Sequence, residues 1–180
     1  MYSQTQDPFS DEMKVEKIVE PFEVLKEIIS TGIVLASGNQ GFVKGTQKAV
    51  CLSEIPLSAV HHFAAAPSEK KARYRFYGIA LSKKTIFNSG GRPVIYLPDN
   101  EADWIPNDHK WRHVRYEFGN VDFTHEREWR VPGDLDLTKA PGLYILVWSP
   151  TEAKQLYEMQ SPLQKLIRGV LPMEHINQML

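Results

Sequence analysis

The chain is organised around the stretch Phe123-Thr-His-Glu-Arg-Glu-Trp-Arg-Val131, which places two carboxylates, two guanidiniums, an imidazole and an indole within nine residues. The turn residues Pro132-Gly133-Asp134 follow directly, which favours a strand that ends near Val131 over a helix that continues. Side chains alternate between the two faces of a strand, so Glu126, Glu128 and Arg130 are expected on one face. The stretch therefore predicts a short strand with two glutamates facing one cleft.

The two glutamates admit two interpretations. Paired carboxylates can divide the work of a reaction, one holding a ribose hydroxyl or stabilising an oxocarbenium-like centre and the other orienting or deprotonating an acceptor. The alternative is structural, with Glu126 and Glu128 paired to Arg127, Arg130 or nearby cations in a surface ladder. Local sequence leaves both interpretations open.

Length and composition fit one domain. The chain has 180 residues, of which 42% are hydrophobic and 24% charged, so it can bury a substantial core. We expect residues 1–13 to be frayed and residues 14–180 to form a single domain. Residues 1–10 are polar and lack the basic-then-apolar pattern of a secretory signal, no apolar run approaches the roughly 20 residues of a membrane span, and one cysteine excludes an internal disulfide. These features favour a cytoplasmic protein with no membrane partner.

The charge balance argues against a global attraction to nucleic acid. Twenty-one basic and 22 acidic residues give a formal net charge of -1, so any phosphate contact must be local. Two basic-aromatic patches, Lys70–Arg75 and His109–Arg115, could supply one, with bases stacked on Tyr74 or Trp111. Charge runs of this kind are more often solvated faces.

The order of expected elements predicts an α+β fold. Phe22, Leu25, Ile28 and Ile29 recur at helical spacing after Pro21. The apolar run over 142–148 predicts a central strand. We expect helices over 21–32, 56–64, 151–160 and from Pro162 onward, and strands over 14–19, 32–37, 48–53, 74–81, 92–97 and 142–148, with a loop over 98–107 and a strand or helix over 111–118. Because strands and helices do not alternate strictly, we expect one mixed or antiparallel sheet with carboxy-terminal helices.

Several motifs that would define other functions are missing. The chain has no phosphate loop, no dinucleotide-binding glycine pattern, no His-Glu-x-x-His and no paired cysteines, so no metal site is predicted. Cys51 is expected to be a small core residue. His61 and His62 are adjacent and cannot chelate one metal from a helix. Either histidine together with Glu128 leaves a metal-independent nuclease as a third interpretation.

Four segments in order resemble the AbiGi family of bacterial abortive phage-infection proteins. The segments are Phe22–Ile33, Ala49–Ser58, Tyr77–Ser82 with Arg92–Tyr96, and Glu126–Arg130. Their order is similar to that of divergent ADP-ribosyltransferases such as the DarT toxins. The resemblance implies an ADP-ribosyltransferase fold and an NAD-dependent glycosyltransferase, acting as a toxin or phage-defence effector on a nucleic-acid or protein acceptor.

The resemblance also implies residue roles. Glu128 matches the catalytic glutamate that holds the ribose of NAD and stabilises the cationic sugar as nicotinamide leaves. Glu126 matches the position two residues earlier that assists the acceptor. Ser53 matches a strand-borne hydroxyl that supports the glutamate and the nicotinamide ribose.

Residue chemistry suggests further contacts to NAD. Arg75 or Arg92, or the nearby Arg73, would bind the pyrophosphate, and Tyr96 or Trp129 would provide a stacking surface. The histidine or arginine of the first motif, which should precede the first helix, is absent from residues 14–20. This absence keeps an alternative open, namely a catalytically inactive relative that serves as an antitoxin or phage-sensing module and binds a cognate protein.

Overall fold

A computed structural model describes residues 20–39, 42–62, 64–65 and 74–174. Its α-helices are α1 (Pro21–Thr31), α2 (Lys83–Asn88) and α3 (Pro150–Glu158). Its strands are β1 (Ile33–Val34), β2 (Ala49–Ser53), β3 (Ala64–Ala65), β4 (Tyr74–Arg75), β5 (Gly78–Ala80), β6 (Arg92–Pro93), β7 (Ile95–Leu97), β8 (His113–Arg115), β9 (Glu128–Pro132), β10 (Leu135–Asp136), β11 (Leu143–Val147) and β12 (Ile167–Pro172). The expected frayed terminus over 1–13 and the expected strand over 14–19 lie outside the described residues.

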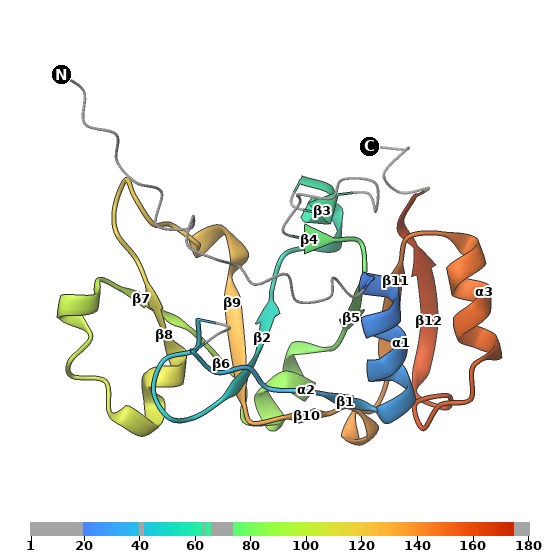
Figure 1. The fold of residues 1–180 in the computed structure, drawn as a ribbon, viewed down its shortest axis with the longest axis horizontal. Coiled ribbons are helices and arrows are strands. Elements are labelled where there is room, and N and C mark those ends of the chain that lie inside the picture. Colours follow the sequence, from blue (N-terminus) through green and yellow to red (C-terminus); the bar gives the residue numbers. More distant parts are fainter. Residues whose placement is uncertain (1–19, 40–41, 63, 66–73, 175–180) are drawn as a thin grey trace.

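The strands form several small sheets, and the fold is α+β. Two sheets have three strands, ordered β12-β11-β5 and β2-β9-β6, and the pairs β1-β10, β3-β4 and β7-β8 complete the set in the described part of the chain. Parallel and antiparallel pairs occur together, which confirms the expectation of mixed pairing, although the strands do not join into one sheet. Figure 1 shows β7 and β8 at one end of the long axis, α3 at the other, and β2 and β9 between them. The single domain over 14–180 and the ADP-ribosyltransferase-like fold stay predictions.

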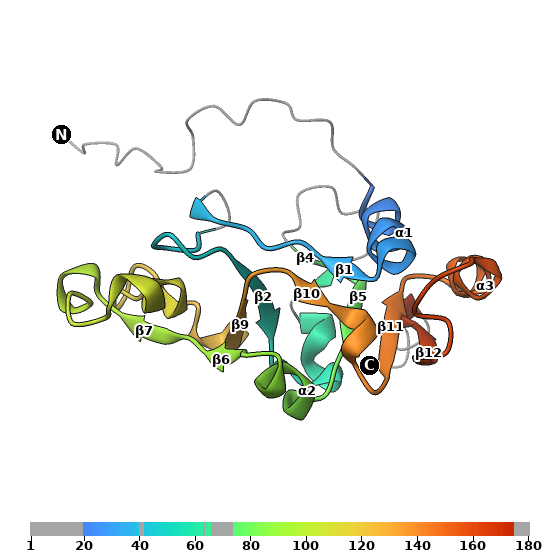
Figure 2. The ribbon, with the colours of Figure 1, turned by 90° about the horizontal axis from the view of Figure 1, so that it is seen from below.

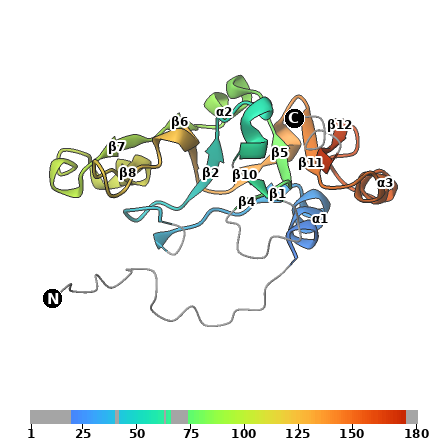
Figure 3. The same ribbon diagram turned by 90° about the horizontal axis from the view of Figure 1, so that it is seen from above.

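The first helix forms as its sequence predicts. Pro21 occupies the first turn, where its missing N–H costs no hydrogen bond. Gly32 ends the helix in the left-handed region, at φ 73°, and its N–H donates to the carbonyl of Ile28 at 2.8 Å. Leu25 and Ile29 are buried. Figures 2 and 3 show α1 on one side of the layer of strands and α2 on the other.

The core is built around β11, which lies between β12 and β5. Leu143, Ile145 and Val147 alternate along β11 and are completely or almost completely buried, which confirms the central strand predicted over 142–148. Ser149 and Glu152 form a capping box at the start of α3, and Leu156 of that helix packs into the same core. Short-range sequence signals therefore agree with tertiary packing in this region.

The expectation of a helix that begins at Pro162 is wrong. Residues 162–166 form turns, and β12 follows and pairs in parallel with β11. The apolar spacing that indicated a helix is satisfied by a single turn that buries Leu163. Gly169 then lets β12 approach β11, because a Cβ there would lie 3.3 Å from the ring of Tyr144. Between β11 and β12 the chain therefore forms α3, which serves as the crossover that a parallel pair requires, and residues 173–174 are again helical.

Other expected elements are shorter than predicted. The helix predicted over 56–64 is a 3-10 helix over Leu57–His62, followed by β3. The expected strand over 92–97 divides into β6 and β7 at Val94, whose N–H donates to the carbonyl of Glu128 at 3.1 Å. Since β6 pairs with β9 and β7 pairs with β8, the chain changes partner at this point. Pairing with other strands, which local sequence does not encode, sets these boundaries.

The remaining elements also differ in extent from the expected ones. The strand predicted over 32–37 is reduced to β1, and the strand predicted over 74–81 divides into β4 and β5. The expected loop over 98–107 contains a 3-10 turn at Asp99–Glu101, and a second 3-10 helix at Asn107–Arg112 leads into β8. Nowhere in the described ranges is a helix both long and apolar enough to cross a membrane.

Candidate functional site

One face of the β2-β9-β6 sheet gathers polar side chains. In the antiparallel register Ser53 lies opposite Glu128 and Cys51 lies opposite Arg130, while Arg92 of β6 also lies opposite Arg130. Directly opposed residues of antiparallel strands share a face. The alternate residues of β2 and β9 point the other way and contribute to the hydrophobic core, namely Val50, Leu52, Trp129 and Val131. We call the first set the polar face.

A buried ion pair lies at the centre of the polar face. Arg130 Nε donates to Glu128 Oε1 at 2.7 Å, and the two residues are only 3% and 9% exposed. Arg130 Nη1 also donates to the carbonyls of Trp111 at 2.8 Å and His113 at 3.4 Å. These bonds satisfy part of the guanidinium away from water. Glu128 is therefore held rigidly and is not a mobile surface carboxylate.

The basic-aromatic patch at His109–Arg115 contributes to this packing. Trp111 and His113 are 4% and 3% exposed, so neither ring can stack on a base in this arrangement. Arg112 donates to the carbonyl of Pro93, and Arg115 is paired with Glu117. The patch therefore packs against β9 and β6, through the bonds of its carbonyls to Arg130 and of Arg112 to Pro93. Most of the other patch, over residues 70–73, lies outside the described residues.

Glu126 does not share a strand face with Glu128, which corrects the sequence expectation. Thr124–Glu126 is a 3-10 turn, Arg127 adopts the left-handed conformation with φ 48°, and β9 begins only at Glu128. Asp122 starts the turn, because its carboxylate accepts from both the N–H and the hydroxyl of Thr124. These hydrogen bonds lower the pKa of Asp122.

Two predicted site residues hold this turn by its backbone. Ser53 Oγ donates to the carbonyl of Glu126 at 2.5 Å. Tyr96 donates through its hydroxyl to the carbonyl of Phe123 at 3.1 Å and accepts from the N–H of Glu128 at 3.1 Å. Burial raises the pKa of Tyr96, so its hydroxyl keeps the proton that it donates. The structure thus brings Ser53, Tyr96, Glu126 and Glu128 together.

Glu54 is a residue of this region that the sequence reasoning did not assign. Its carboxylate accepts from Trp129 Nε1, Arg127 Nη2 and Lys83 Nζ, each at 2.8 Å. The Lys83 ammonium, followed by the Trp129 indole, lowers the pKa of Glu54. The one signal in the sequence was its place directly after Ser53, since its partners lie in distant segments.

The predicted pyrophosphate contacts are placed differently. Arg92 lies on the polar face, but its guanidinium donates to the carbonyls of Phe87 at 3.1 Å and Gly91 at 2.6 Å and stacks 3.9 Å from the Phe87 ring centre. Arg75 lies on β4, which pairs with β3 in a separate sheet. A role of either arginine in NAD binding stays a prediction.

Cys51 lies beside the central ion pair and is exposed, so the expectation of a core cysteine is wrong. The sequence predicted a strand buried on both faces, whereas the main core receives only the Val50 side, and on the Cys51 side only Ala49 is buried, against Val43 and Trp111. Neighbouring atoms still desolvate the sulfur in part. This desolvation, opposed by Arg130 and reinforced by the Glu128 carboxylate, raises the pKa of the thiol to about 11.

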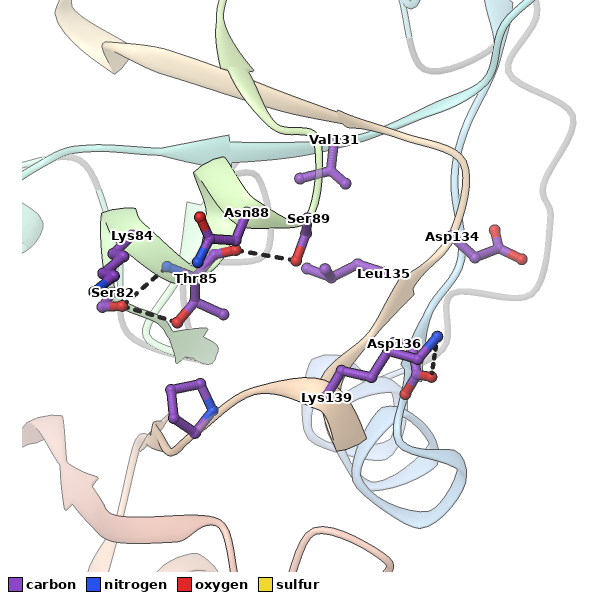
Figure 4. Close-up of a pocket in the computed structure, with 11 residues that line it drawn as sticks. Ser82, Lys84, Thr85, Asn88, Ser89, Val131, Asp134, Leu135, Asp136 and Lys139 are labelled. Atoms are coloured by element: carbon purple, nitrogen blue, oxygen red, sulfur yellow. Dashed lines mark hydrogen bonds and ion pairs between the residues drawn. The ribbon is translucent and has the colours of Figure 1, made fainter.

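A cavity of about 480 Å³ lies elsewhere, between α2 and the segment after β9. Figure 4 shows Ser82, Lys84 and Asn88 on one wall and Asp134, Asp136 and Lys139 on the other. None of the predicted site residues lines it. Its β9 residue is Val131, which points away from the polar face, and many of its polar groups bond within the walls, including the Lys139–Asp136 pair at 3.2 Å. The cavity is therefore separate from Glu128.

No group of three or more histidine, cysteine, aspartate or glutamate side chains in the described residues could hold a metal ion. His61 and His62 belong to the 3-10 helix Leu57–His62, but their side chains lie outside the described part. The nuclease interpretation therefore stays a prediction.

The chain matches no protein-family model, and neither curated proteins nor solved structures include a significant match to it. The resemblance to the AbiGi family and to ADP-ribosyltransferases accordingly stays a prediction from motif order.

Proposed function

We propose that this protein is an NAD-dependent ADP-ribosyltransferase that modifies a nucleic-acid or protein acceptor in the cytoplasm, as a toxin or phage-defence effector. The observation that carries the proposal is the direct opposition of Ser53 and Glu128 on β2 and β9. The resemblance implies that Ser53 supports Glu128, although the two residues lie in segments far apart in the chain. Their meeting on one polar face supports a shared role.

In the proposed reaction Glu128 is the catalytic carboxylate. The bond between the ribose carbon and the nicotinamide nitrogen breaks, and its electron pair leaves with nicotinamide. The negative charge of Glu128 stabilises the cationic sugar that remains. A nucleophile on the acceptor then forms the new bond to that carbon, and its proton passes to Glu126 or to water. NAD is thus a substrate, and no redox step is involved.

The surrounding residues support this role chiefly by placing Glu128. Ser53 binds the carbonyl of Glu126 within the turn, Tyr96 binds the backbone on both sides of the turn, and Arg130 orients Glu128 through Oε1. In the proposed complex, Oε2 of Glu128 accepts a hydrogen bond from the ribose hydroxyl. The hydroxyls of Ser53 and Tyr96 already bind the backbone. They contact NAD only through their remaining lone pairs, and Tyr96 also through the surface of its ring.

The test is transfer of label from NAD to purified acceptors or cell extract. Wild type should transfer label, and Glu128→Gln should lose transfer by about 100-fold or more, because the substitution removes the charge that stabilises the sugar cation. Glu158→Gln, on the exposed end of α3, is the matched control and should transfer label at the wild-type rate.

Both variants must be assayed at a temperature where denaturation curves show them folded, since Glu128 also belongs to a buried ion pair. Absence of transfer by folded wild type, or equal transfer by Glu128→Gln, would exclude the proposal.

A second candidate is a catalytically inactive relative that binds a cognate toxin or antitoxin protein. The specific observation in its favour is the buried pair of Glu128 with Arg130, which gives the glutamate a sufficient structural reason to be present. This candidate expects a stable complex with the partner protein, recovered equally with wild type and Glu128→Gln, and no transfer from NAD.

A further inference from the structure

We propose that Glu54 is the positioning residue of the turn that carries Glu126 and Glu128, and that it acts through Arg127. The activity readout of this inference rests on the proposed function, whereas its structural readout does not. Glu54 is the residue after Ser53 at the end of β2. It faces the turn from the strand that also supplies the Ser53 hydroxyl.

Arg127 is the residue of this region with an unfavourable backbone conformation. Its φ of 48° and ψ of 49° place it in the left-handed region, where a side chain with a Cβ crowds the backbone. Its N–H donates to the carbonyl of Thr124 at 3.1 Å. Such a conformation persists only where the surroundings hold it. Ser53 and Tyr96 bind the neighbouring backbone, and Glu54 binds Arg127 itself.

Glu54 binds Arg127 at two points. The N–H of Glu54 donates to the carbonyl of Arg127 at 3.2 Å, and the Glu54 carboxylate accepts from the Arg127 guanidinium at 2.8 Å. The same carboxylate accepts from the indole of Trp129 at 2.8 Å. Arg127 and Trp129 are the two neighbours of Glu128 in the chain. One carboxylate therefore holds the residues on both sides of Glu128, while Arg130 holds Glu128 itself.

The exposure of these groups favours positioning over a contribution to stability. The side chains of Arg127 and Glu54 are 56% and 23% exposed, and ion pairs so close to solvent contribute little to folding free energy. They still restrict geometry, since a guanidinium donates in fixed directions. Loss of Glu54 should therefore disturb the turn while leaving the fold largely intact.

The experiment is a double-mutant cycle between Glu54→Gln and Arg127→Gly. Glycine accepts the left-handed conformation without a partner, so Arg127→Gly removes the need for Glu54. Glu54→Gln should lower kcat for ADP-ribosyl transfer by about tenfold or more through misplacement of Glu128. It should leave KM for NAD within about threefold, because Glu54 does not touch the substrate. In the Arg127→Gly background the same substitution should change kcat by less than about threefold.

Lys83→Gln, which removes a Glu54 partner outside the turn, is the matched control and should leave kcat within about twofold.

Amide hydrogen exchange tests the inference without activity. Glu54→Gln should speed exchange at the N–H groups of Arg127 and Glu128, and glycine at position 127 should abolish the difference. Val131, in the same strand and buried, is the internal reference and should keep its rate.

The two proposals fail separately. If folded wild type transfers no label but Glu54→Gln loosens these two amides, the proposed function fails and the inference stands. If exchange at Arg127 and Glu128 is unchanged in Glu54→Gln, or changes equally in the Arg127→Gly background, the inference is overturned.

Discussion

Arg130 Nε donates to Glu128 Oε1 at 2.7 Å between two side chains that are 3% and 10% exposed. The two residues are i and i+2 on β9, so their side chains leave the strand on the same face. This pair both orients the proposed catalytic carboxylate and makes that carboxylate part of the folded structure. Loss of activity on substitution of Glu128 therefore has to be separated from loss of stability.

The ion pair should show strong coupling in unfolding. Arg130→Met leaves a buried carboxylate without its cation and should lower the free energy of unfolding by about 3–5 kcal/mol. Glu128→Gln retains an acceptor oxygen but leaves the buried Arg130 cation without its anion, and should lower the free energy of unfolding by about 3 kcal/mol. The double variant should be no less stable than Arg130→Met, because no uncompensated charge remains. Urea denaturation measures all three, and strictly additive losses would contradict the pairing.

Cys51 should react slowly although it is exposed. Its thiol has a pKa of about 11 against an ordinary 9.0, so at pH 8 the folded protein holds about 100-fold less reactive thiolate than an unfolded chain. Alkylation at pH 8 should be slower in buffer than in urea by about that factor and should rise steeply toward pH 11. Because Cys51 is the one cysteine in the sequence, mass spectrometry of the intact chain gives the rate directly. Equal rates in buffer and urea would show that the thiol is not desolvated.

The raised pKa of Cys51 also predicts the sign of a stability change with pH. The folded thiol keeps its proton to higher pH than the unfolded one, so its contribution to folding is complete below pH 9.0 and is lost as pH rises through about 11. Cys51→Ala should therefore lose less stability between those two pH values than wild type does. A parallel decline in the two proteins would assign the effect to other groups.

The capping box of α3 should contribute measurably to stability. Ser149 Oγ accepts from the N–H of Glu152 at 3.3 Å, and the Glu152 carboxylate accepts from the N–H of Ser149 at 2.9 Å. Ser149→Ala leaves the N–H of Glu152 without its acceptor and should lower the free energy of unfolding by about 1 kcal/mol. Ser30→Ala is the control, since its hydroxyl only donates back to the carbonyl of Glu27 on an exposed helix face, and it should change stability by less than about 0.5 kcal/mol. Thermal denaturation compares the two.

Gly91 should tolerate no side chain. A Cβ there would lie 2.6 Å from Ile86 Cγ2 and 2.7 Å from the Ile86 carbonyl oxygen, and 3.0 Å from Val131. A carbonyl of α2 cannot move without disturbing the helix, so Gly91→Ala should lower stability by about 1–3 kcal/mol. At Gly38 the nearest atom to a Cβ is Lys48 Cγ at 3.7 Å, and Gly38→Ala should be close to neutral. Similar effects at the two glycines would contradict the close approach of Gly91 to α2 and to Val131.

Local sequence signals predicted the elements whose ends are set by neighbouring residues. Pro21 and Gly32 bound α1, and Ser149 caps α3, because backbone restriction and capping act within a few residues. The buried strand over 142–148 was also predictable, since an apolar run of this length needs partners on both faces. In the site, the spacing of Glu128 and Arg130 correctly placed them on one face.

The errors arose where distant segments decide the outcome. The turn at Thr124–Glu126 interrupts the strand that charge alternation predicted, so Glu126 leaves the polar face. Pro162 opens turns and not a helix, because the chain that follows pairs with β11. The periodicity of a segment shows which of its residues are apolar, but it does not show with which distant strand the segment will pair.

The sequence by itself determined the α+β class, the first helix, the capped start of α3, the central strand and the segments that contribute to the polar face. Tertiary structure alone decided that Ser53 lies opposite Glu128, that Glu128 forms an ion pair with Arg130, and that Glu54 accepts hydrogen bonds from Arg127 and Trp129, which lie 73 and 75 positions away in the chain. The physical reason is the distance along the chain over which each interaction acts. Caps, turns and periodicity act over one or two turns of backbone, whereas strand register and buried charge pairing depend on which distant segments desolvate one another.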